Sequence, residues 1–122
     1  MAAPNLVNVT SIYGKTMGAA LGTTLTTTLL TCASNKVLKI NSIIVANVDG
    51  TNAADASVTF YDSSATASYR LASTVSVPAD STLIVIGKDS PIYLEESDEI
   101  RGGAGAASDL EITISYEELD DA

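Results

Sequence analysis

Apolar and polar residues alternate along several stretches of this chain, as they do in a β-strand that buries one face. The clearest stretch covers residues 110–117, where apolar and polar side chains alternate without a break. A similar spacing over residues 69–77 predicts that Leu71, Val75 and Val77 point inward. Residues 38–48 are apolar on both faces, which predicts a central strand covered on both sides.

Shorter stretches rich in Val, Ile and Thr complete the pattern, separated by clusters of Gly, Pro, Asp and Ser. We expect further strands within residues 6–12, 24–32, 56–61, 83–86 and 92–94, and near Ile100. A helical period is hinted at only in residues 17–21, where Gly18 and Gly22 interrupt it. About eight short strands predict an all-β fold, a single-domain antiparallel β-sandwich of jelly-roll or immunoglobulin-like type.

Length and composition agree with one small domain over residues 1–122. Apolar residues make up 46% of the chain, which excludes a disordered protein. No apolar run approaches the roughly 18–20 residues of a membrane helix, so no membrane partner is expected. The N-terminus lacks the basic and hydrophobic regions of a secretory signal, so we expect folding in a cytoplasm.

Charge is distributed unevenly along the chain. Residues 1–48 carry three lysines and no acidic residue, whereas residues 49–122 carry all fifteen acidic residues. The net charge of −9 repels phosphate backbones, so nucleic-acid binding is not expected. The weakly charged N-terminal part is the one that can lie against another protein without a large desolvation cost.

The residue types needed for common catalytic chemistry are missing. The chain has no histidine, so the usual Ser-His-Asp and Cys-His arrangements are unavailable. Its single cysteine, Cys32, lies in an apolar context and is expected to be a core residue. We therefore expect a protein that is not an enzyme and that has no cofactor.

Two glycine-containing motifs resemble phosphate-binding loops without meeting their requirements. Gly14-Lys15-Thr16 looks like the end of a P-loop, but Val9 stands where the loop needs its first glycine. Residues 103–108 approach a dinucleotide fingerprint but precede a predicted strand, whereas the pyrophosphate requires a helix N-terminus. A hairpin loop is the better interpretation of residues 103–108.

Two acidic segments are candidates for a metal or carboxylate site. Residues 49–55 offer several oxygen ligands, but Phe60 occupies the position where an EF-hand requires glutamate. Asp and Asn are also common in turns, where their side chains form hydrogen bonds with the nearby backbone. A turn is therefore favoured over a metal site for residues 49–55. The acids of residues 95–99 are expected to form a solvated connection between strands.

Several strand and turn segments together resemble small virion structural proteins of tailed phages, of the kind carried by marine cyanophages. The matching segments, with an opening Ala2–Asn5 that also fits, are Lys39–Asn47, Val77–Leu83, Pro91–Asp98 and Ile112–Glu118. The resemblance covers most of the chain from about residue 37 onward. It implies a β-sandwich component of the virion without naming its position on the particle.

One departure from those relatives concerns a turn. Many of them have glycine after the Glu-Glu pair, where this chain has Ser97, so the geometry of that turn stays open.

The expected function is that of a capsid decoration (cement) protein on the outer surface of the head, present in the host cytoplasm before assembly. Its partners would be other virion proteins, with the major capsid protein favoured, and a homo-oligomer, with a trimer favoured. A tail, neck or fibre-attachment component is the nearest alternative. A carbohydrate- or receptor-binding β-sandwich is the alternative from another class, although scattered tyrosines without tryptophan make a poor sugar platform.

The N-terminal segment, residues 1–24, is predicted to be a docking arm. It contains one charge, Lys15, among small and apolar residues, so burying it costs little desolvation. An equally favoured interpretation is that residues 6–12 form an edge strand of the sandwich. The residues expected to touch a partner are Leu6, Val7, Val9, Ile12, Tyr13 and Leu21.

Overall fold

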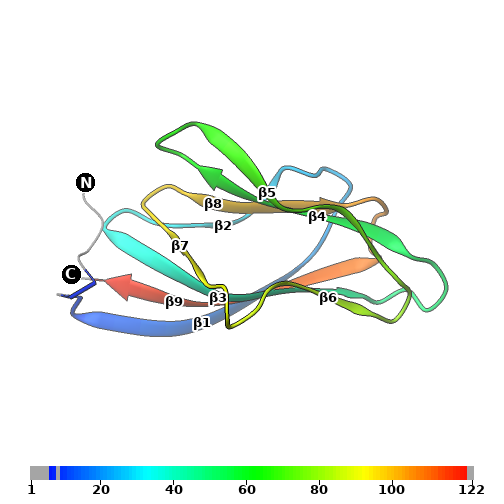
Figure 1. The fold of residues 1–122 in the computed structure, drawn as a ribbon, viewed down its shortest axis with the longest axis horizontal. Coiled ribbons are helices and arrows are strands. Elements are labelled where there is room, and N and C mark those ends of the chain that lie inside the picture. The colour runs from blue at the N-terminus through cyan, green and yellow to red at the C-terminus, as the bar shows by residue number, and fades with distance from the viewer. Residues whose placement is uncertain (1–5, 8, 121–122) are drawn as a thin grey trace.

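Two antiparallel sheets pack face to face in the computed structural model, which describes residues 6–7 and 9–120 (Figure 1). These residues form nine strands: β1 (Ser11–Ala20), β2 (Thr27–Thr31), β3 (Lys36–Asn47), β4 (Ala54–Asp62), β5 (Ala67–Val77), β6 (Thr82–Ile86), β7 (Ile92–Leu94), β8 (Glu99–Ala104) and β9 (Leu110–Asp120). The described part of the chain contains no helix, and so none that is long and apolar enough to span a membrane. The predicted all-β sandwich is confirmed.

The strand order distinguishes between the two topologies that the sequence left open. One sheet has the order β1-β9-β3-β6, with β7 also paired to β3, and the other has the order β2-β8-β4-β5. β6 and β7 pair with different halves of β3, so they share one position at the edge of the sheet. An immunoglobulin-like fold would place the first two strands side by side, whereas here β1 and β2 lie in different sheets. The order is that of a jelly roll.

A β-bulge in the central strand β3 explains why that segment is apolar on both faces. Asn41 is the extra residue, because Ile40 and Ser42 pair with successive residues of β9. Beyond the bulge, Ile43 takes over the buried face and Ile44 points to the outer face of the sheet. The prediction that β3 is covered on both faces is therefore wrong. The extra residue at the bulge changes which residues face the core, and this change makes the strand apolar at both alternate sets of positions.

Strand β5 also departs from the regular alternation that its sequence predicts. Ala72, rather than Leu71, pairs with Val58 of β4, and Leu71 is left half-buried as an extra residue. Val75 was also expected to be buried, but it is 37% exposed on this edge strand. A second irregularity places Thr74 in the left-handed region, at φ 47°, where its N–H donates to Ser57 Oγ at 3.0 Å. Both irregularities lie on an edge strand, where bulges discourage pairing with other chains.

The core lies between the sheets and is almost entirely aliphatic. Leu110, Ile112 and Ile114 of β9 have no exposed surface, as their alternation predicted. They pack with Ile43 of β3 and Ile100 of β8 in one cluster that joins both sheets. A side chain of this size contributes about 1.5–3 kcal/mol to stability when it is fully buried.

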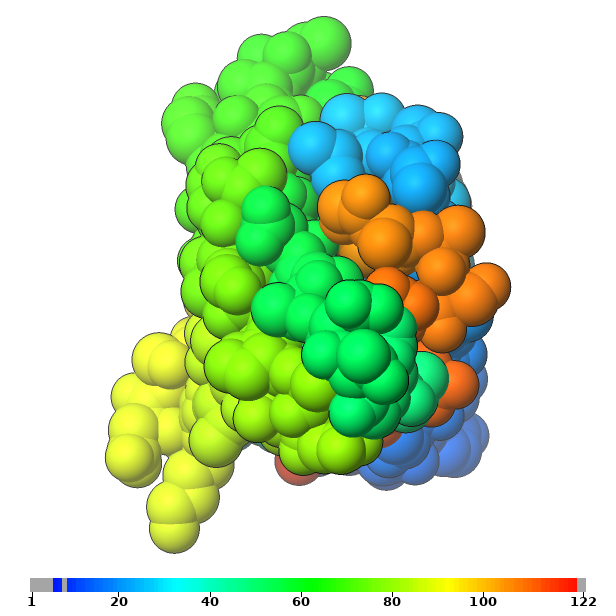
Figure 2. Space-filling view, turned by 90° about the vertical axis from the view of Figure 1, so that its right-hand side faces the viewer, coloured from blue at the N-terminus to red at the C-terminus, as the bar shows by residue number. Residues whose placement is uncertain are grey.

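The glycine pair of β8 allows the β1–β2 connection to cross close to the sheet. A Cβ atom on Gly103 would lie 2.8 Å from Leu25 Cα and even closer to the carbonyl oxygen of Thr24. The neighbouring Ala104 donates its N–H to the carbonyl oxygen of Gly22 at 2.8 Å. Figure 2 shows this crossing from outside, with the light-blue connection against the orange end of β8. Close packing therefore accounts for these glycines.

Two buried polar residues organise the loops at opposite ends of the sandwich. Asn47 is 3% exposed and donates to the carbonyl oxygens of Val77 and Asn52, at 2.9 and 3.0 Å. Asp98 is 4% exposed and accepts the N–H groups of Ser63 and Glu95, each at 3.0 Å. The expectation that the acids of residues 95–99 all face solvent is thus wrong for Asp98, because its carboxylate is needed inside as an acceptor.

The turn at Ser97 has the backbone geometry that glycine favours. Its φ is 72°, and its N–H donates to the carbonyl oxygen of Cys32 at 2.9 Å. The serine found at this position is therefore accommodated in a left-handed turn.

The first strand lies later in the chain than its sequence predicts. Residues 6–7 lie in a turn, and β1 covers residues 11–20, including the stretch with a helical hint. Pairing with β9 along all of β1 outweighs the weak local preference. Residues 11–20 therefore belong to the sandwich itself, while residues 1–5 and 8 of the expected docking arm lie outside the described residues.

Candidate functional site

The two sheets have four edges in the described part of the chain, and they differ in how well they are protected. β2 is five residues long and bulged, and β5 carries two irregularities. The edge formed by β6 and β7 is interrupted by residues 87–91, which stand out from the body in yellow in Figure 2. β1 is ten residues long and pairs with β9 without any shift of register. It is the one regular edge, and natural sheets usually protect such edges.

The hydrogen-bond phase of β1 shows which backbone groups face outward from the sheet. Leu21 donates its N–H to Leu110 at 2.9 Å, directly after the last pair of the register. Since antiparallel residues alternate in the direction of their backbone groups, Gly14, Thr16 and Gly18 direct theirs away from β9. These groups form a free edge, which we call the β1 edge (residues 12–20).

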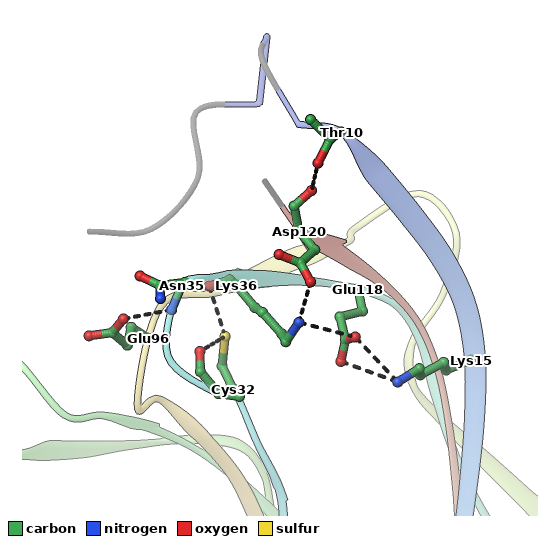
Figure 3. A network of polar contacts seen from close by, with 9 residues as sticks. Thr10, Lys15, Cys32, Asn35, Lys36, Glu96, Glu118 and Asp120 are labelled. Atoms are coloured by element: carbon green, nitrogen blue, oxygen red, sulfur yellow. Dashed lines mark hydrogen bonds and ion pairs between the residues drawn. The ribbon is translucent and has the colours of Figure 1, made fainter. Parts of the chain in front are cut away.

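The one charge on β1 is neutralised inside the domain. Lys15 Nζ lies 3.3 Å from Glu118 on β9, and the same carboxylate lies 3.8 Å from Lys36 of β3. Lys36 also pairs with Asp120, whose hydrogen bond raises the pKa of the lysine (Figure 3). The one charged side chain of β1 therefore already has a counter-ion within the domain.

Small side chains leave the outer face beside the β1 edge open to a partner. Gly14, Thr16, Gly18 and Ala20 are all exposed, and Gly14 has no atom within 4 Å of the place of a Cβ. Near the end of β1, a shallow pocket of about 280 Å³ is lined by Gly18–Ala20 and Glu111–Thr113. A backbone can approach this face closely, and a partner side chain fits the pocket.

The structure separates the six residues that the sequence assigns to partner binding. Ile12 and Tyr13 are 59% and 52% exposed at the start of β1, and Leu6 and Val7 precede them at 47% and 87%. Val9 is half-buried. Leu21 is 1% exposed and belongs to the core, so this assignment is wrong: the residue directly after the edge turns inward.

The sequence did not indicate that the backbone of residues 12–20 forms a regular sheet edge. The residues concerned, Gly14, Thr16 and Gly18, are small and have no large apolar side chain to indicate a contact. Their clearest signal was a run of glycine and alanine in a segment with one charge. Whether such a run is paired on one side or on two depends on the other strands of the sheet.

The motifs that resemble phosphate-binding loops have other roles in the fold. Gly14-Lys15-Thr16 lies in the extended strand β1, so its N–H groups cannot converge on one phosphate. Gly103 and Ala104 end β8, and residues 105–109 form the connection to β9. No helix follows either motif in the described part of the chain.

In the acidic loop after β3, the Asp49 side chain forms hydrogen bonds with residues of the same loop. Asp49 accepts the N–H of Thr51 at 2.8 Å and a side-chain bond from Asn52, and these bonds hold the pKa of Asp49 below its usual range. Asp55, six residues further along the chain, lies exposed on β4. Among residues 6–7 and 9–120 no three metal-ligating side chains come together. The turn interpretation fits residues 49–55 better than a cation site.

Cys32 is a core residue, as its sequence context predicts. It is 1% exposed, and its thiol donates to the carbonyl oxygen of Lys36 at 3.2 Å (Figure 3). Burial raises the pKa of the thiol to about 11, so it stays protonated at neutral pH. A protonated, buried thiol is a poor nucleophile.

No protein-family model and no curated protein matches the chain.

Proposed function

We propose that this chain is a non-enzymatic structural protein of a phage virion, which decorates the outer surface of the head and docks through the β1 edge. The observation that carries the proposal is the length and regularity of that edge, together with its compensated charge. The resemblance to small virion proteins supplies the biological setting. The favoured partner is an exposed strand of the major capsid protein.

Strand addition gives the physical basis for this docking. An added strand gains affinity from main-chain hydrogen bonds and specificity from pockets for alternate side chains. The β1 edge offers outward backbone groups at every second residue, and the pocket beside Gly18–Ala20 accepts a side chain. Exposed Ile12 and Tyr13 add apolar area at one end.

The charge of the remaining surface supports an external position on the particle. The net charge is −9, and the fifteen acidic residues all follow residue 48. Such a protein does not compete with the coat for DNA, because like charges repel. A trimer is favoured, since a weak contact repeated around a symmetry axis gains affinity through multivalency.

The decisive experiment compares two substitutions at Gly14, where a Cβ meets no atom within 4 Å. Gly14→Pro removes an outward N–H that makes no bond within the sheet, while Gly14→Ala keeps it. We expect both variants to fold, Gly14→Ala to bind capsids assembled without the protein, and Gly14→Pro to lose binding in a sedimentation assay.

The outcomes distinguish the proposed contact from its rivals. Equal binding by both variants would overturn the docking role of the β1 edge. Loss of self-association with unchanged capsid binding would make the edge a contact between copies. Copy number per virion tests the position: hundreds of copies agree with head decoration, whereas a few dozen or fewer would assign the protein to the neck, tail or fibre.

A further inference from the structure

The two arginines of the chain lie side by side on one exposed sheet face, far from each other in sequence. Thr59 of β4 pairs with Arg101 of β8 on one side and with Arg70 of β5 on the other. Residues paired in this way point to the same face, and two strand spacings place the arginine Cα atoms about 10 Å apart. Val58 is in the core, so this row lies on the outer face of the sheet.

Arg101 is held in place by contacts that leave one side of its guanidinium available. Its Nε donates to Glu99 Oε1 at 2.7 Å, and its Cζ lies 3.8 Å from the centre of the Tyr61 ring. Thr28 also donates to the same oxygen of Glu99, at 2.8 Å. The terminal Nη groups of Arg101 have no hydrogen-bond partner among residues 6–7 and 9–120. A guanidinium fixed in this way loses little entropy when it binds a ligand.

Thr59, between the arginines, has an unsatisfied hydroxyl group. It is 2% exposed, and its Oγ1 is the one buried side-chain polar atom without a hydrogen-bond partner in the described structure. Buried polar groups are normally paired, because leaving one unpaired costs about 1–3 kcal/mol. Arg70 is exposed and has no polar partner among the described residues either. The Thr59 hydroxyl, the Arg70 guanidinium and the Nη groups of Arg101 thus lack an acceptor among the described residues, while the Nε of Arg101 is paired with Glu99.

We propose that Arg70, Thr59 and Arg101 form a binding site for the carboxylate of an acidic sugar on the outer face of the four-stranded sheet. Guanidinium groups match a carboxylate in planar, two-pronged geometry. The Thr59 oxygen has almost no accessible surface in the free domain, so its hydroxyl donates to the carboxylate once the side chains over it move aside. This surface lies on the sheet that does not contain the β1 edge, so it is independent of the docking proposed above.

The surroundings of the three donors favour a sugar that carries one charge. Ser68 and Tyr61 pair with one another two residues along the strands, on the same face. Their hydroxyl groups can form hydrogen bonds with the hydroxyl groups of a sugar ring. A densely charged polyanion is disfavoured by the net charge of −9. A uronic acid, with one carboxylate per ring, meets both conditions.

The test is a titration of the isotope-labelled full-length protein with galacturonic acid, galactose and acetate, followed by nuclear magnetic resonance. We expect galacturonic acid to shift the signals of Thr59 and of both arginine side chains, and galactose to leave them unchanged. Acetate should bind at least about fivefold more weakly than galacturonic acid, because it lacks the hydroxyls. Equal affinity for acetate, or for a short glutamate peptide, would overturn the sugar assignment.

Three variants define the site. Arg70→Gln should weaken galacturonic acid binding about tenfold, and Thr59→Val about fivefold. Lys88→Gln, which removes a positive charge from the exposed β6–β7 loop, serves as the matched control and should bind as the parent does. Arg70 is exposed, so its variant should keep the fold. Unchanged binding by Arg70→Gln, or no shift with galacturonic acid, would overturn the proposal.

Discussion

The carboxylate of Asp98 accepts a hydrogen bond from the backbone N–H of Ser63, 3.0 Å away, although the two residues lie in different loops. The second oxygen of the same carboxylate accepts the N–H of Glu95, also at 3.0 Å. The backbone carbonyl of Asp98 accepts the N–H of Cys32 at 2.9 Å. One buried residue therefore joins the β4–β5, β7–β8 and β2–β3 loops at one end of the sandwich.

Replacing Asp98 by Ala should lower the free energy of unfolding by about 2–4 kcal/mol, because two backbone N–H groups lose a charged, buried acceptor. Asp89→Ala is the matched control in the exposed β6–β7 loop, and its effect should stay within about 0.5 kcal/mol. Urea unfolding followed by circular dichroism measures both. Equal effects of the two substitutions would show that Asp98 does not hold the loops together.

Thr59→Val should make the protein more stable, which is unusual for a change at a residue that is 2% exposed. Valine has nearly the same shape and removes the unpaired hydroxyl, so the unfolding free energy should rise by about 1 kcal/mol. Thermal unfolding provides the measurement. A loss of stability would mean that the Oγ1 atom has a partner in solution.

Gly103→Ala should destabilise the domain strongly. Its new Cβ would lie 2.8 Å from Leu25 Cα, and the backbone there cannot move without displacing the β1–β2 crossing. We expect a loss of about 3 kcal/mol or more. Gly14→Ala, with open space around the new methyl group, should cost less than about 1 kcal/mol. A tolerated Gly103→Ala would show that the crossing is more loosely packed than the structure indicates.

The buried thiol of Cys32 predicts a loss of stability in alkaline solution. Its pKa is raised from 9.0 to about 11 by burial, so the unfolded state releases the proton first as the pH rises. The contribution of this group is therefore complete below pH 9.0 and is lost as the pH rises towards 11. It amounts to about 3 kcal/mol.

Cys32→Ala provides the comparison for this pH dependence, because lysines and tyrosines also titrate in the same range. We expect unfolding experiments at several alkaline pH values to show a smaller decline in the variant than in the parent protein. Parallel declines would contradict the prediction. The folded parent should also resist thiol reagents at neutral pH, because the thiol is 1% exposed.

The sequence alone predicted the class of fold and most of the strands. Residues 110–117 show why: the inward residues of β9 are apolar and the outward ones are polar, so the alternation predicts which residues face the core. The buried, unreactive state of Cys32 was predicted in the same way, from its apolar neighbours. Such inferences succeed because alternation and local context are properties of the strand itself.

Other features depend on which strands become neighbours. The bulge at Asn41 is defined by the pairing of β3 with β9. Without that pairing, the apolar residues around Asn41 were wrongly predicted to be covered on both faces of the strand. The strand position of residues 11–20 was likewise missed, because their weak local preference yields to pairing with β9. Local composition contains no information on pairing partners far away in the chain.

The sequence by itself therefore determined an acidic, histidine-free, all-β domain whose weakly charged N-terminal part differs from the rest. Only the tertiary structure decided that residues 12–20 form an edge with no further strand beside it in the described part of the chain, and that Arg70 and Arg101 lie on either side of Thr59. The physical reason is that an edge, or a row of side chains across a sheet, is created by the order of the strands. Arg70 and Arg101, which are 31 positions apart in the chain, lie in one row because β4 lies between β5 and β8 in the sheet.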